Sequence, residues 1–162
     1  MALPLTLGIL AALLGQSGWK TYAPKGEIFS AKFPSAPQTS KQTNSEAGYT
    51  VDTRMFRSLS ANGVFQVVLM RPNGKADAAF RKALITGFKG GLLRSSGGKE
   101  TSTTQGKLGP YPGTNVKFNV GVNKGEYWAI QSKGEVYILV AVAPPAKFAA
   151  QKATFFNSFK LY

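Results

Sequence analysis

The side chains that most often carry out catalysis are missing from this 162-residue chain, which contains no histidine and no cysteine. It therefore lacks an imidazole for general acid–base work, a thiol nucleophile, and any nitrogen or sulfur ligand for a transition metal. Its seven carboxylates stand singly along the chain, at Glu27, Glu46, Asp52, Asp77, Glu100, Glu126 and Glu135. No spacing among them suggests a calcium loop or a paired acid and base, although distant residues can meet in space. We predict no catalytic residue, no cofactor and no metal site.

One short segment matches two catalytic patterns incompletely. Ser96 and Lys99 have the Ser-x-x-Lys spacing, but the companion motifs are absent and the two glycines between them do not favour the helix on which that pair depends. The same segment fails as a phosphate-binding loop, because Leu93 stands where the first glycine is needed and Glu100 follows the lysine. We interpret residues 96–99 as a loop.

The strongest chemical signal is positive charge. Lys and Arg number 20 against 7 Asp and Glu, which gives a formal net charge of +13. Such an excess favours anionic partners or surfaces, and the alternative is a solvated surface that only keeps the protein soluble. Lys82 and Lys89 fall on one side of a predicted helix with Lys75 near its start, and we take these three lysines as candidates for an anion-binding surface.

Aromatic residues lie beside basic residues at two places. Trp19, Tyr22, Tyr127 and Trp128 are candidates for an exposed platform that stacks bases or sugars while nearby lysines attract an anion. Alternate aromatic residues in strands more often face a core, and this second interpretation applies to Tyr22 and Trp128 in particular.

The most apolar strand of the chain is predicted at residues 135–143. Val136 and Ile138 point to one side of an extended chain while Tyr137 and Leu139 point to the other, so both faces are apolar. We therefore expect this strand to be central in a sheet and covered on both faces.

A helix is predicted directly after this strand. Pro145 suits a first helical turn, and Phe148, Phe155 and Phe159 recur at roughly helical spacing, so they can dock on the strand that the chain has just left.

The remaining segments supply the neighbours of these two elements. Strands are predicted at 19–22 and 28–33, a hairpin joins 49–59 to 64–70, and the polar segment 38–48 suits an edge strand or a mobile loop. These segments extend the sheet towards one edge.

A second helix is predicted at residues 76–88. Asp77 lies near its start and Gly90 and Gly91 are expected to end it. Residues 94–106 fit a loop or an exposed strand, and 114–122 begins three adjacent antiparallel strands that finish with the central one.

Residues 1–17 have the pattern of a signal peptide. Their apolar run from Leu3 to Leu14 is too short to span a bilayer and ends in small residues suited to signal peptidase, although no Lys or Arg precedes it. The alternative is an uncleaved N-terminal helix. We expect an exported protein, periplasmic or secreted, with one domain at 18–162.

Several motifs, in their order along the chain, resemble those of proteins with the Mog1/PsbP-like fold. They are Trp19, Tyr22, residues 29–34 (FSAKFP), residues 109–113 (GPYPG) and residues 155–161 (FFNSFKL). The resemblance implies an α+β fold in which an antiparallel sheet has helices packed on both faces, an α/β/α sandwich. In that group some members bind a small GTPase or assist photosystem II, and many bacterial exported members have no assigned activity, so function does not follow from the fold.

Three functions remain open from the sequence. The first is an exported, non-catalytic binding or accessory domain that meets an anionic envelope protein, membrane surface or polymer. The second is a binder of single-stranded nucleic acid or another polyanion, which an export signal disfavours for nucleic acid. The third is an enzyme with an unrecognised carboxylate pocket. We rank them in that order and predict that the protein is not an enzyme.

Overall fold

The computed structural model describes residues 18–46, 48–74 and 76–162. The predicted signal peptide at 1–17 lies outside the described residues, and its cleavage stays a prediction. The elements in chain order are β1 (Lys20–Tyr22), β2 (Phe29–Phe33), β3 (Gln38–Glu46), β4 (Tyr49–Ser60), β5 (Gly63–Pro72), α1 (Ala78–Ser96), β6 (Lys99–Leu108), β7 (Tyr111–Val120), β8 (Asn123–Ser132), β9 (Glu135–Ala143), α2 (Pro145–Asn157) and β10 (Lys160–Leu161). Neither helix in these ranges is long and apolar enough to cross a membrane.

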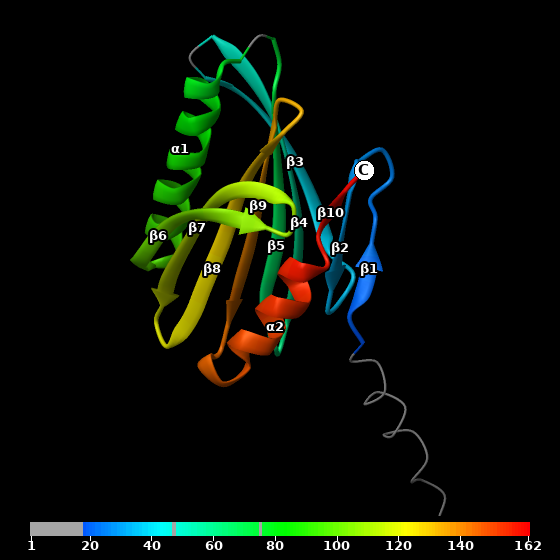
Figure 1. Cartoon of the computed structure of the whole chain (residues 1–162), viewed down its shortest axis with the longest axis vertical. Coiled ribbons are helices and arrows are strands. Elements are labelled where there is room, and N and C mark those ends of the chain that lie inside the picture. Colours follow the sequence, from blue (N-terminus) through cyan, green and yellow to red (C-terminus); the bar gives the residue numbers. More distant parts are fainter. Residues whose placement is uncertain (1–17, 47, 75) are drawn as a thin grey trace, which may run out of the picture.

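Seven strands form one antiparallel sheet in the order β3-β4-β5-β9-β8-β7-β6, with β9 in the middle (Figure 1). Ile138 of β9 pairs with Val68 of β5 on one side and with Ala129 of β8 on the other. The predicted central strand, the β4–β5 hairpin and the three adjacent strands β7, β8 and β9 are all confirmed.

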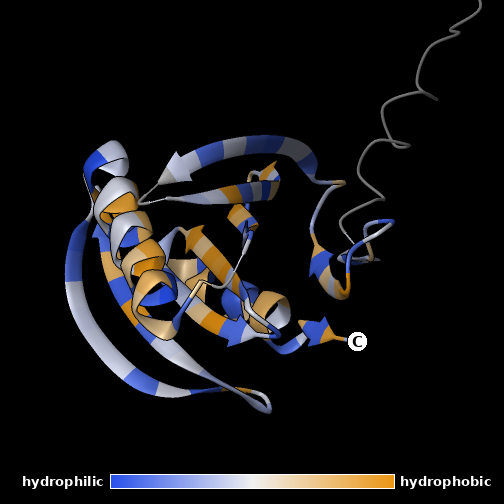
Figure 2. Cartoon of the chain, turned by 90° about the horizontal axis from the view of Figure 1, so that it is seen from above, coloured by the Kyte–Doolittle hydropathy of each residue, from blue (hydrophilic) through white to orange (hydrophobic). Residues whose placement is uncertain are grey.

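Both faces of β9 are covered, as its two apolar faces predicted. Tyr137 and Leu139 belong to a core that is shared with α2 and with the small sheet β1-β2-β10. Ile138 and Val140 pack on the opposite face with Phe80 of α1. These four β9 side chains are at most 3% exposed. Figure 2 shows the sheet between α1 on one side and α2 on the other, which confirms the α/β/α sandwich.

Helix α1 is longer than the sequence predicted. It begins at the predicted place, where the Asp77 carboxylate accepts a hydrogen bond of 2.8 Å from the Phe80 N–H. The prediction that Gly90 and Gly91 end it was wrong, since the helix continues to Ser96. Two interior glycines weaken a helix by only about 1 kcal/mol each. The following Leu92 and Leu93 are half-buried, and their packing against the core on the sheet offsets that cost.

The end of α1 is set by Gly97 instead. This residue adopts the left-handed conformation (φ 64°), and its N–H is directed to the carbonyls of Leu93 and Arg94. Ser96 Oγ donates to the carbonyl of Leu92 at 2.7 Å. The segment that matched the Ser-x-x-Lys pattern is therefore a helix C-cap followed by the first residue of β6.

Helix α2 begins at Pro145, as predicted. Phe148 and Phe155 are buried on the side of α2 that faces the sheet. Phe159 is also buried, at 5% exposure, but it lies beyond the helix end at Asn157. Its ring contacts Phe29 and Tyr137, with centroids 6.0 Å apart in each case. The spacing of the phenylalanines correctly predicted that Phe159 is buried, but it wrongly placed this residue within the helix.

The structure also shows the conformation of two segments for which the sequence allowed either a loop or a strand. Residues 99–108 form β6, a strand at one edge of the sheet, and residues 38–46 form β3 at the other edge. Both strands are almost entirely exposed, which explains their polar composition.

Candidate functional site: the basic surface

Most of the acidic side chains form ion pairs or hydrogen bonds within the protein. The side chain of Glu27 is fully buried and forms ion pairs with Arg54 and with Arg71, the latter at 2.5 Å between Oε2 and Nη2. Arg71 also reaches Glu135, with 2.5 Å between Nε and Oε1, and Tyr137 donates its hydroxyl to Glu135 Oε2 at 2.5 Å. Two carboxylates distant in sequence therefore meet through one guanidinium, a cluster that no local motif could reveal.

The environment of this cluster shifts two pKa values. Burial, followed by the hydrogen bond to Glu135, raises the pKa of Tyr137, so the phenol stays a donor. Desolvation lowers the pKa of Arg71, but its hydrogen bonds to Glu135 and Glu27 outweigh that effect and leave the pKa raised. The carboxylates are held by fixed cations, which is the arrangement of a structural ion cluster rather than of a general acid–base pair.

Two further acids each hold a lysine. Glu126, which is 5% exposed, accepts from Lys152 Nζ at 2.6 Å and from Asn115 Nδ2 at 2.9 Å. Glu100 lies 2.9 Å from Lys89 Nζ, and a hydrogen bond from Thr103 followed by that lysine lowers the pKa of Glu100. The burial of Tyr127 nearby, together with the charge of Glu100, raises the pKa of that phenol.

The other two described acid side chains are also engaged. Asp77 caps α1, and Asp52 accepts a hydrogen bond of 2.5 Å from Thr43 Oγ1. The side chain of Glu46 lies outside the described part of the structure. Four cations, Arg54, Arg71, Lys89 and Lys152, take part in the ion pairs of the described residues. Among the described residues, most lysines and arginines therefore stand outside these ion pairs.

Six exposed cations gather at one end of the sheet, where the β4–β5 and β7–β8 turns lie. We call this region the basic end and define it by Arg57, Arg94, Lys99, Lys117, Lys124 and Lys147. Strand register places its members together, because Lys99 pairs with Asn119, which pairs with Lys124. Lys147 Nζ donates to Asn62 in the β4–β5 turn at 3.0 Å.

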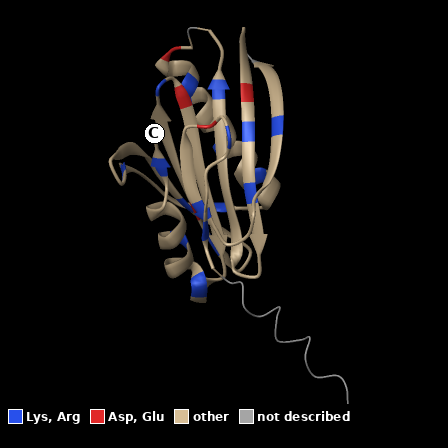
Figure 3. Cartoon of the chain, turned by 90° about the vertical axis from the view of Figure 1, so that its right-hand side faces the viewer, with Lys and Arg blue, Asp and Glu red and all other residues tan. Residues whose placement is uncertain are grey.

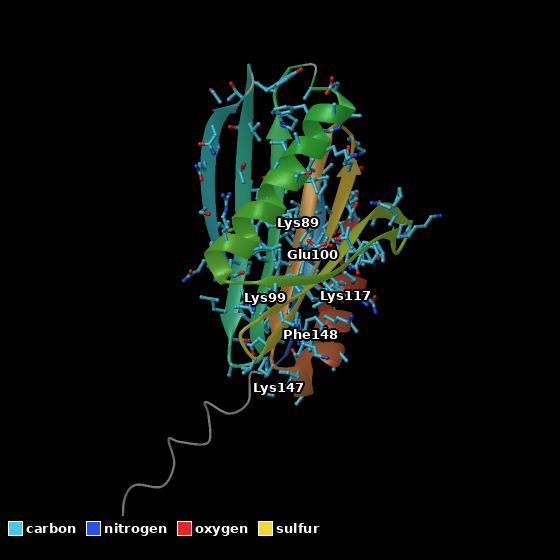
Figure 4. The ribbon with its side chains drawn as sticks, turned by 90° about the vertical axis from the view of Figure 1, so that its left-hand side faces the viewer. Lys89, Lys99, Glu100, Lys117, Lys147 and Phe148 are labelled. Carbon is cyan, nitrogen blue, oxygen red and sulfur yellow. The ribbon has the colours of Figure 1, made fainter. Side chains whose placement is uncertain are left out.

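The labelled members of the basic end lie in the same half of the molecule. Lys99, Lys117 and Lys147 come from β6, β7 and α2, and all three lie below Lys89 in Figure 4. The two acids near them, Glu100 and Glu126, are already paired with lysines. Figure 3 shows the acidic residues on its visible side gathered towards the opposite end of the molecule. The visible acids therefore lie away from the basic end, in a half of the molecule that also carries lysines and arginines.

Neither Lys82 nor Lys89, the two described lysines of the predicted anion-binding surface, belongs to the basic end. Lys82 and Lys89 line a groove of about 460 Å³ between α1 and strands β6 to β8, with Tyr127 among its lining residues. Lys82 is exposed, whereas Lys89 is paired with Glu100. Lys75 lies outside the described residues.

The four aromatic residues proposed as a platform are not brought together. Trp19 packs on Phe65 with ring centroids 4.8 Å apart, and Tyr22 and Trp128 are likewise half-buried against the core of the α2 face. Tyr127 is only 1% exposed and belongs to the core beneath α1. Core packing, the second interpretation from the sequence, describes where these side chains lie.

The basic end was missed because its members come from separate segments. The alternation of residues 114–122 placed Lys117 on the side of its strand opposite to Val116 and Phe118, and this signal was present in the sequence. Its proximity to Lys147 on α2 depends on the packing of the helix over the sheet. Within the described ranges, no group of three or more acidic residues could hold a metal ion.

Comparison with known proteins identifies the fold. No protein-family model matches the chain, and no curated protein matches its sequence. The structure is similar to the solution structure of cyanobacterial PsbP (CyanoP) from Synechocystis sp. PCC 6803, with a TM-score of 0.60 and 11% identity over 97% of this chain and 98% of that one. It is also similar, with a TM-score of 0.47 and 14% identity, to a crystal structure from Bacteroides thetaiotaomicron VPI-5482, covering 90% of this chain and 49% of that chain. The fold is PsbP-like, which confirms the resemblance seen in the sequence.

Proposed function

We propose that this PsbP-like chain is an exported, non-catalytic binding domain that meets an anionic partner through its cationic surface. One observation carries the proposal: the described acids are occupied by internal partners, while the six cations of the basic end are exposed. Surface charge of one sign raises the local concentration of oppositely charged partners and speeds their association.

A non-catalytic role is supported by the state of the carboxylates. An enzyme with a carboxylate pocket would need an acid free to exchange a proton with a substrate. Glu27 and Glu135 are instead bonded to arginines, and Glu126 is bonded to Lys152. Each of these acids serves as a fixed counter-charge in the fold.

Binding of single-stranded nucleic acid finds less support than binding of an anionic surface. That activity depends on aromatic faces on which successive bases can stack. The ring of Tyr127 is buried, and those of Trp19, Tyr22 and Trp128 pack against the core. We therefore do not propose it.

Cell fractionation tests the proposal. The exported protein should sediment with the cell envelope at low ionic strength and be released by salt, because the screening length falls from about 30 Å at 0.01 M to about 3 Å at 1 M. A chelator should not release it. Protein that stays in the soluble fraction at low ionic strength would contradict the proposal, and release by chelator alone would point to a metal-dependent contact.

A further inference from the structure

We infer that the basic end is a docking surface for an anionic lipid bilayer, an inference that rests on the proposed function and names its partner. Each of the six cations comes from a different element, and Arg94 on α1 and Lys147 on α2 lie on helices that cover opposite faces of the sheet. Such a distribution surrounds the tip of the molecule and does not line a single groove. It suits contact with a broad, flat, negatively charged surface.

Exposed apolar side chains lie at the same end. Leu59, beside the β4–β5 turn, is 53% exposed, and Val122, in the β7–β8 turn, is 84% exposed. In the described part of the chain only Tyr162 joins them as a large exposed hydrophobic residue. Proteins that bind at a membrane interface combine apolar groups that enter the headgroup region with surrounding lysines and arginines. Lys124 lies two residues from Val122, which gives this combination at one turn.

The N-terminal strand β1 starts beside the basic end. Trp19 packs on Phe65, close to the start of β5 at the β4–β5 turn, so Gly18 lies beside the basic end (Figure 1). The residues that precede Gly18 include the apolar run from Leu3 to Leu14. The predicted cleavage removes this run and leaves the docking surface intact, because all six cations lie between Arg57 and Lys147.

The opposite end provides the orientation. Glu27 and Glu135 lie there, both paired with Arg71, and Asp52 lies opposite Arg71 on the neighbouring strand β4. An anionic bilayer attracts the basic end more strongly than the end that carries the acids. The protein is therefore expected to bind with its basic end facing the membrane.

Vesicle binding by two matched variants tests the inference. The basic-end variant combines Lys99→Gln, Lys117→Gln, Lys124→Gln and Lys147→Gln. The control variant combines Lys25→Gln, Lys41→Gln, Lys107→Gln and Lys160→Gln, four exposed lysines outside the basic end. Both lose the same charge. Binding of the exported protein to phosphatidylglycerol vesicles is measured against phosphatidylcholine vesicles, and thermal melts check that both variants fold.

The basic-end variant should lose about fivefold in affinity for each lysine, up to roughly 600-fold together, whereas the control should lose far less. Equal losses in the two variants would overturn the inference. Protein that binds dextran sulfate and the envelope fraction but no vesicle would also overturn it while the proposed function stands. Protein that binds neither vesicles nor dextran sulfate at low salt would remove both.

A labelling experiment tests the contact directly, because the chain has no cysteine. A polarity-sensitive dye on Val122→Cys should shift to a less polar environment when phosphatidylglycerol vesicles are added. The same dye on Ser45→Cys, an exposed position at the far end of β3, should not shift. A shift at Ser45 with none at Val122 would show that the opposite end docks.

Discussion

Replacement of Glu27 by Gln tests the buried ion cluster that joins the loop between β1 and β2 to the large sheet. The substitution keeps the size of the side chain and removes its charge. Glu27 accepts from Arg54 with one carboxylate oxygen and from Arg71 with the other. Glutamine offers one oxygen and one NH₂ group, so one of the two arginines would face a donor instead of an acceptor.

The expected loss of stability is about 3 kcal/mol, the lower end of the range of about 3 to 5 kcal/mol for breaking a buried ion pair. The lower end of this range applies because each arginine keeps another group that can stabilise its charge when Glu27 is replaced. The side chain of Arg54 is 36% exposed and can regain water, while Arg71 keeps its contact with Glu135. For a chain of this size, a loss of about 3 kcal/mol corresponds to a fall of roughly 6 to 12 °C in Tm.

Denaturant unfolding and thermal melts of Glu27→Gln and Glu100→Gln provide the measurement. Glu100→Gln removes a comparable ion pair at the surface, where the side chain is 32% exposed, and should cost about 0 to 1 kcal/mol. Vesicle binding by Glu27→Gln at a temperature where it is folded should be unchanged or slightly stronger, because a negative charge is removed. If both variants lose a similar small amount of unfolding free energy, Glu27 does not hold the β1–β2 loop to the sheet.

Three other predictions concern processing, the core and pH. Intact-mass measurement of exported protein should place its N-terminus close to Gly18 or Trp19, and retention of Met1 would end the cleavage prediction. Ile138→Ala in the fully buried centre of β9 should cost about 2 to 5 kcal/mol in denaturant unfolding, while exposed Lys41→Ala should be near neutral, and equal small losses would contradict the assignment of the core. Binding to anionic vesicles should stay nearly constant from about pH 5 to pH 8, because the chain has no histidine, and a steep change in that range would require a titrating group with a strongly displaced pKa.

The sequence predicted the elements of the fold where local pattern decides them. The two apolar faces of residues 135–143 required cover on both sides, and β9 is the central strand between α1 and α2. Pro145 and Asp77 marked the starts of the two helices for the same reason, since capping and proline geometry depend on neighbouring residues.

Local pattern failed where a tertiary contact outweighed a local preference. Gly90 and Gly91 weaken α1, yet the helix passes through them because the half-buried Leu92 and Leu93 pack against the core on the sheet. Composition could not distinguish a loop from an edge strand in residues 99–108 either, because an exposed edge strand takes polar side chains and owes its shape to pairing with β7.

The charge of the chain was fixed by composition, but its arrangement was decided by the tertiary structure. A count of 20 Lys and Arg against 7 Asp and Glu sets the net charge of +13 whatever the fold. Only the folded chain brings Glu27 and Glu135 to the same guanidinium, and only it gathers Lys99, Lys124 and Lys147 at one end. The physical reason is that charges interact through space, whereas a sequence pattern reports separation along the chain.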